Sequence, residues 1–228
     1  MATEGRRRGR GGGGAGGRRG GRRGGGQGRG RGRRGEGRGG IRAFLAFEIP
    51  EAVRHALVGE IDRLRRALPP ARWIRPENLH VTVKFLGNVE PARLKRLNQG
   101  LAERLEELEP VAFRLGGAGF FPSASQARVA WVGGRADGVE DVVAEVEAVA
   151  AMLGFPRERN EWRLHLTVAR LDSAWPRYAA EELLAWGEDL ALPRFECREL
   201  VCFRSRLQSG GPVYTPLERI RLGCRGER

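Results

Sequence analysis

The sequence predicts an α+β fold made of two similar lobes with a cleft between them. The first observation is a repeat: the pattern His-x-Thr-x occurs at 80–83 and again at 165–168, each time in an alternating, β-rich run. The second is the order of elements, because each half shows a strand, then a helix, then the strand that carries the motif. A pattern repeated on this scale indicates a duplicated unit.

The elements of the first half follow from periodicity and from the positions of proline and glycine. Pro50 suits the first turn of a helix, and apolar residues then recur at helical spacing until Pro69 and Pro70. The predicted elements are, in order, a strand at 41–49, a helix from Pro50 to Leu68, the first motif strand at 79–86, a helix at 91–108, a strand at 111–115 and a glycine-rich turn at Gly116, Gly117 and Gly119.

The second half repeats the order of strand, helix and motif strand. Its predicted elements are a strand at 128–132, a helix at 139–153, the second motif strand at 163–171, a helix at 177–190, and two strands at 195–204 and 213–222 separated by Gly210-Gly211. The two motif strands therefore occupy corresponding positions in the two halves.

The positive charge of the chain is concentrated in one segment. Residues 1–40 hold 20 glycines and 13 arginines against two glutamates, whereas residues 41–228 hold 28 Lys+Arg against 26 Asp+Glu. A segment without aromatic side chains cannot bury enough apolar surface to fold, so we expect 1–40 to be a disordered tail and 41–228 to form the two-lobed domain. The tail arginines can bind RNA phosphates non-specifically.

The remaining composition favours a cytoplasmic protein. We find no apolar run of the length that a membrane span needs, and the N-terminus lacks the apolar segment of a secretory signal. The three cysteines, Cys197, Cys202 and Cys224, are odd in number and lack metal-type spacing, so we expect free thiols in a reducing compartment. We expect a monomer that has no membrane partner.

The two motifs can supply acid–base chemistry on a phosphodiester. In a strand, residues i and i+2 share a face, so His80 lies beside Thr82 and His165 beside Thr167. Two histidines in opposite protonation states can act as acid and base, and the hydroxyls can hold the non-bridging oxygens. We expect Lys84 on the same face by the same alternation, although a solvated lysine at a strand end would fit the sequence equally well.

The remaining polar and aromatic residues allow more than one interpretation. We expect no metal and no cofactor, because neither motif strand offers a cluster of ligands. His55, in the first helix, has no repeated context and is interpreted as structural. Trp73, Trp131 and Trp162 could stack on bases, but packing is favoured, and Tyr214 could contact a ligand or simply pack.

These residues resemble those of a known family, the two-histidine phosphoesterases, and within it the RNA 2′,3′-cyclic phosphodiesterases once named 2′-5′ RNA ligases. The similar segments extend from about Ile41 to Leu222. They are the opening RAFLAFEIP, the run 72–87 through the first motif, GFFP at 119–122, RVAWVG at 128–133, HLTVAR at 165–170 and GPVY at 211–214.

The resemblance implies a bilobal duplicated fold with pseudo-two-fold symmetry, in which antiparallel sheets line the central cleft and helices lie outside. It implies hydrolysis of a terminal RNA 2′,3′-cyclic phosphate to a 2′-phosphomonoester, with His80 as proton donor and His165 as proton acceptor. The lack of ligand clusters beside the motifs makes metal-free acid–base catalysis the simpler mechanism. Thr82 and Thr167 would hold the phosphate, and Lys84, Arg128 and Tyr214 are the candidate substrate-binding residues.

The sequence leaves alternatives open. The chain could act as a 2′-5′ RNA ligase, which is the reverse chemistry, or as a non-catalytic RNA-binding protein whose tail carries the affinity. Residues 1–40 are not a usual part of the family, so they are either an added RNA-binding arm or an over-extended start. Leu164 replaces a proline that many relatives have, which removes no chemical group.

Overall fold

The computed structural model describes residues 39–223, so the predicted tail, apart from Gly39 and Gly40, and Cys224 lie outside the described part. Its helices are α1 (Glu51–Ala67), α2 (Pro91–Leu105), α3 (Val139–Met152), α4 (Arg177–Asp189) and the short 3-10 turns η1 (Pro76–Asn78) and η2 (Ala124–Gln126). Its strands are β1 (Ile41–Glu48), β2 (Arg72–Trp73), β3 (His80–Val89), β4 (Val111–Phe121), β5 (Val129–Asp137), β6 (Leu166–Arg170), β7 (Phe195–Cys197), β8 (Glu199–Gln208) and β9 (Gly211–Arg221).

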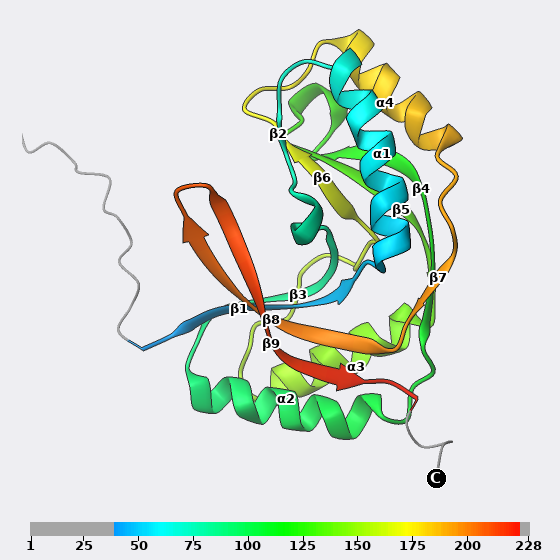
Figure 1. Ribbon diagram of the computed structural model, residues 1–228. Helices are drawn as coiled ribbons and strands as arrows, with labels where there is room; N and C mark the ends of the chain where they lie inside the picture. Colours follow the sequence, from blue (N-terminus) through cyan, green and yellow to red (C-terminus); the bar gives the residue numbers. More distant parts are fainter. Residues whose placement is uncertain (1–38, 224–228) are drawn as a thin grey trace, which may run out of the picture. The chain divides into compact units, whose positions relative to one another are not determined.

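The strands form one curled antiparallel sheet in the order β7-β4-β5-β6-β3-β1-β8-β9, with β2 paired to β6 (Figure 1). The chain runs β1-α1-β3-α2-β4 in the first half and β5-α3-β6-α4-β8 in the second. β4 pairs with β5 and β8 pairs with β1, so the last strand of each half completes the sheet of the other half. This arrangement confirms the predicted duplicated α+β fold.

The helices cover the sheet in two pairs (Figure 1). α2 and α3 lie against the part formed by β3, β1, β8 and β9, whereas α1 and α4 lie against the part formed by β4, β5 and β6. Each helix buries one apolar stripe, for example Leu94, Leu97, Leu101 and Leu105 of α2. No helix of residues 39–223 has the length and apolar character needed to cross a membrane.

The glycine-rich turn predicted at 116–119 is wrong, because β4 continues through it. The pairing of β4 with β5 shifts between Leu115 and Ala118, and Gly117 takes a φ of 70° that suits glycine. On β5, a Cβ at Gly134 would lie 2.1 Å from the carbonyl oxygen of Arg114. The glycines therefore allow β4 and β5 to approach closely where their pairing is irregular. From the sequence alone, a cluster of glycines predicts a turn.

The strand predicted at 195–204 is also divided. β7 ends at Cys197 and β8 begins at Glu199, and the two segments pair with β4 and β1 respectively. The chain passes here from one half of the sheet to the other. The thiols of Cys197 and Cys202 are free, as predicted, and both are buried.

Candidate active site

The two motifs meet where the halves of the sheet join. Val81 of β3 pairs with Leu166 of β6 in antiparallel register, and both side chains are fully buried in the core. Neighbouring residues point to the opposite face, so His80, Thr82, His165 and Thr167 share it. We call this face of the sheet the motif face. The register sets His80 toward Thr167 and Thr82 toward His165.

Both imidazoles are held in the same way by the backbone. His80 Nδ1 lies 2.6 Å from the carbonyl oxygen of Asn78, and His165 Nδ1 lies 2.8 Å from that of Arg163. A carbonyl oxygen can only accept, so each Nδ1 carries a hydrogen and donates it. Nε2 is therefore the reactive nitrogen of each ring, an acceptor when the ring is neutral and a donor when it is protonated.

Aromatic rings surround His80. The ring of Phe44 lies 4.9 Å from the imidazole, and that of Tyr214 meets it edge-on at 5.2 Å. Burial is the largest cause that lowers the pKa of His80 from its ordinary value of 6.5, and the positive charges of His165 and Arg170 lower it further. The hydrogen bond to the Asn78 carbonyl acts in the opposite direction and offsets part of this shift.

The surroundings of His165 are more open. The ring of Phe121 meets its imidazole edge-on at 5.2 Å, and Trp131 of β5 pairs with Thr167. Thr82 is nearly buried, and its carbonyl accepts a hydrogen bond of 3.0 Å from the indole of Trp162. Both threonines are thus fixed by strands that have neighbours on each side.

A β-bulge follows each motif and changes which residues share its face. Pairing with β1 shifts between Thr82 and Lys84, so Lys84 lies opposite the core residue Leu45. Its ammonium group is buried, 2.5 Å from Glu147 of α3 and 3.0 Å from the carbonyl of Pro156. The prediction that Lys84 lies on the face of His80 is therefore wrong, and so is the alternative of a solvated lysine.

The second bulge places Arg170 on the motif face, where regular alternation does not predict it. Pairing with β5 shifts between Thr167 and Ala169, so Ala169 enters the core and Arg170 returns to the motif face beside Val129. Arg170 is exposed, and its charge contributes to the lowered pKa of His80. Burial raises the pKa of Tyr214, and the charge of Arg170 opposes that rise. Arg170 is the site cation that the sequence analysis missed, because its odd offset from His165 predicts the opposite face.

Of the other two candidate substrate-binding residues, Tyr214 lies beside a motif histidine and Arg128 does not. Tyr214 contacts both His80 and Phe44, so it lies beside the first imidazole, and its contact with a substrate stays a prediction. Arg128 directs its guanidinium group to the carbonyl of Asp172, and it precedes Val129, which is on the motif face. The structure therefore does not bring Arg128 to the histidines.

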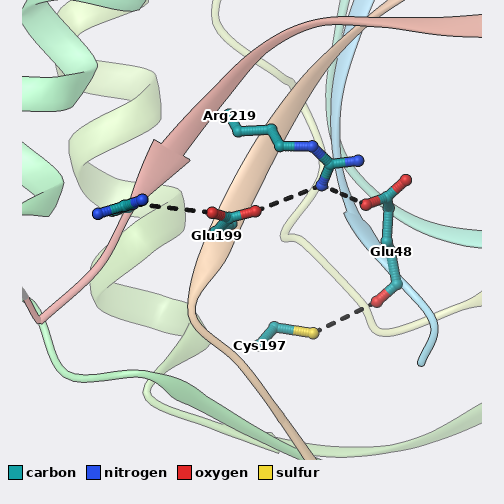
Figure 2. Close-up of polar contacts among 5 residues, drawn as sticks. Glu48, Cys197, Glu199 and Arg219 are labelled. Carbon is teal, nitrogen blue, oxygen red and sulfur yellow. Dashed lines mark hydrogen bonds and ion pairs between the residues drawn. The ribbon is translucent and has the colours of Figure 1, made fainter.

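A polar network borders His80 on the other side. Glu48 of β1 pairs with His80, and its carboxylate lies 2.5 Å from Arg219 of β9 (Figure 2). Arg219 also contacts Glu199, 3.3 Å away, and the thiol of Cys197 donates to the carbonyl of Glu48 at 3.4 Å. Burial raises the pKa of that thiol to about 12, so it stays protonated. The Glu48 carboxylate is thus engaged by arginine rather than by the imidazole.

Around the Val81–Leu166 pair, the motif face therefore combines two imidazoles, two hydroxyls and the guanidinium group of Arg170. Residues 39–223 contain no group of three or more His, Cys, Asp or Glu side chains placed to hold a metal ion. The groups that are present can exchange protons and bind an anionic phosphate.

Comparisons with known proteins identify the class to which this site belongs. The family model of the LigT like Phosphoesterase matches residues 47–131 and 133–214. The chain therefore belongs to the LigT-like phosphoesterase family, within the two-histidine phosphoesterases. It is 32% identical to the RNA 2′,3′-cyclic phosphodiesterase of Methanothermobacter thermautotrophicus, over 80% of this chain and 99% of that one.

Solved structures show the same fold. A protein of Thermus thermophilus is 30% identical, with a TM-score of 0.65 over 82% of this chain and 100% of that one. LigT of E. coli, solved in complex with 3′-AMP, is 26% identical, with a TM-score of 0.61 over 80% of this chain and 98% of that one. The resemblance inferred from the motifs is thereby confirmed.

Proposed function

We propose that the protein hydrolyses terminal RNA 2′,3′-cyclic phosphates to 2′-phosphomonoesters by acid–base catalysis without a metal. The observation that carries this proposal is the Val81–Leu166 pair, which sets both imidazole–hydroxyl pairs on one face. The names of the relatives support the choice of substrate.

The reaction divides between the two Nε2 atoms. His165 accepts a proton from water as the water oxygen attacks phosphorus. The bond between phosphorus and O3′ breaks, and His80, protonated at Nε2, donates its proton to O3′, so that the phosphate remains on O2′. Because the histidine pKa lies near neutral pH, one ring can be protonated while the other is neutral.

The hydroxyls and Arg170 bind the non-bridging oxygens. Thr82 and Thr167 lie beside the imidazoles of the opposite motif, so their hydroxyls can donate to oxygens on which charge develops. Arg170 supplies a fixed positive charge on the same face. The anionic substrate in turn favours protonation of His80, because it offsets the charges that lower its pKa.

An oligonucleotide that ends in a 2′,3′-cyclic phosphate, incubated with the full chain and a chelator, tests the proposal. We expect a 2′-phosphate product at an unchanged rate when chelator is added. Recovery of the substrate, or of a 3′-phosphate, contradicts it. With a 5′-hydroxyl acceptor present, formation of a 2′-5′ linkage instead of hydrolysis indicates ligase activity.

We further propose that residues 1–40 add non-specific affinity for RNA phosphates. Their arginines carry most of the net charge of the chain, and arginine binds RNA backbones by releasing counterions. Deletion of 1–40 should leave turnover of short substrates unchanged and make binding of long RNA weaker and less dependent on salt. Loss of all turnover on deletion would instead support an RNA-binding module.

A further inference from the structure

Three arginines lie side by side on the motif face, beyond the histidines. Arg135 of β5 pairs directly with Arg114 of β4. β7 pairs with β4 through Phe195 and Phe113, and Arg194 is the next residue in that register, beside Arg114. All three are exposed, and they line one groove of about 760 Å³. Because neighbouring strands lie about 4.8 Å apart, the row spans roughly 10 Å.

This arrangement is unfavourable without a bound anion. Like charges directly opposite one another on paired strands are destabilising. Within residues 39–223 none of the three guanidinium groups forms an ion pair with a carboxylate, although Arg72, Arg177, Arg198 and Arg219 all do. Asp137 and Glu196 border the groove in the next row, one on each side of Ala112.

The row is close to the site along the same face. The alternation of β5 is regular here, because Val132 and Ala136 both pack in the core, so Trp131, Gly133 and Arg135 share the motif face. Trp131 pairs with Thr167, which places Gly133 at the level of His165. Arg135 lies two residues further, about 7 Å along the strand.

On the motif face of β5, the position between Trp131 and Arg135 is a glycine, at the level of His165. Gly133 has no Cβ, and one added there would lie 2.9 Å from the Trp131 ring. Gly119 of β4 likewise lies under that ring, where a Cβ would be 2.3 Å from it. The indole therefore covers both glycines, and a side chain at either position would clash with it.

We propose that Arg114, Arg135 and Arg194 bind the backbone phosphates of the RNA nucleotides that precede the cyclic phosphate. Arginine presents a planar donor fork that suits phosphate oxygens, and several phosphates along one strand match a row of several guanidinium groups. This inference rests on the proposed function for its choice of ligand. It predicts that the protein prefers an RNA chain to a mononucleotide.

The test compares two substrates with one variant. The triple change Arg114→Gln, Arg135→Gln and Arg194→Gln should raise KM for an oligonucleotide of about ten residues by about tenfold or more. In a plot of log affinity for this oligonucleotide against log salt concentration, the size of the slope should fall by about 2. KM for a nucleoside 2′,3′-cyclic monophosphate and kcat for both substrates should stay within about twofold. Thermal unfolding should show equal or greater stability, because a like-charge row is removed.

A matched triple variant controls for net charge. Arg63→Gln, Arg66→Gln and Arg96→Gln remove three exposed arginines from the outer surfaces of α1 and α2. That variant should keep the KM of both substrates near the wild-type value. Equal effects of the two triple variants, or an equal rise in KM for mononucleotide and oligonucleotide, would overturn the proposal.

Binding separates this inference from the proposed function. If the wild-type chain cleaves neither substrate, the proposed function fails, and the groove is still tested by the affinity for the same oligonucleotide ending in a 2′-phosphate. The row is supported if the first triple variant binds more weakly than the second at each salt concentration. It is refuted if the two variants bind equally.

Discussion

Val81 and Leu166 are the one pair of residues through which β3 and β6 join within the described part of the chain. Both are buried, so the pair fixes the face on which the neighbouring imidazoles and hydroxyls lie. In a regular antiparallel ladder, residues placed diagonally like His80 and His165 are about 7–8 Å apart. That spacing of the two backbone positions leaves room for a phosphate between the rings.

Replacement of either motif histidine should slow the reaction strongly. His80→Ala or His165→Ala should each lower kcat by about two or more powers of ten, which is the scale of one general acid or base. Single-turnover hydrolysis of a cyclic phosphate end measures this effect. The control is His55→Ala, because His55 is exposed on α1 and should have no influence. A loss below about tenfold for either motif variant would refute the acid–base assignment.

The threonine hydroxyls should matter through hydrogen bonding rather than through shape. Thr82→Val and Thr167→Val keep the branched side chain, and each should lower kcat by about a hundredfold, as loss of one donor to a developing oxyanion does. Thr82→Ser and Thr167→Ser retain the hydroxyl and should recover most of the activity. If valine and serine variants behave alike, the threonines only pack.

Sequence alternation correctly predicted that each motif histidine shares a face with its threonine. It failed two residues after each threonine. The helices followed from apolar spacing, and the face shared by His80 and Thr82 followed from a period of two. By alternation Lys84 was expected on the motif face but faces the core, and Arg170 would face the core but lies on the motif face. The reason is that Val83 and Val168 are the extra residues of two bulges. A bulge depends on the register of the partner strand, which the local sequence does not contain.

The two motifs nevertheless depart from regular alternation in the same way. Both bulges come directly after a motif threonine, so Lys84 and Ala169 are equivalent positions that face the core. Phe85 and Arg170 are likewise equivalent and both exposed, one an aromatic ring and the other a cation.

Lys84 should support stability rather than contact the substrate. Lys84→Met leaves Glu147, whose side chain is 20% exposed, without its partner, so the free energy of unfolding should fall by about 3 kcal/mol. Denaturant unfolding measures this change, with Lys95→Met on the exposed side of α2 as control. KM of the folded variant should stay within about threefold of the wild type. A large rise in KM with unchanged stability would place Lys84 in substrate binding instead.

The lowered pKa of His80 has a defined effect on stability. Since the folded protein favours the neutral ring, the unfolded chain binds more protons between the lowered pKa and 6.5. The contribution of His80 to the free energy of unfolding is therefore fully present above pH 6.5 and decreases as the pH falls toward the lowered value. His80→Gln should remove this part of the pH dependence.

The same shift can be measured directly and traced to its causes. In the protein without ligand, imidazole NMR resonances of His80 should titrate below 6.5. Tyr214→Ala exposes the ring and should raise the pKa, because burial is the largest cause of the shift. Arg170→Gln should raise it less, because its charge is a smaller cause. Addition of inorganic phosphate should also raise the pKa if the anion binds between the motifs, and a titration that phosphate leaves unchanged would show that His80 does not face the bound anion.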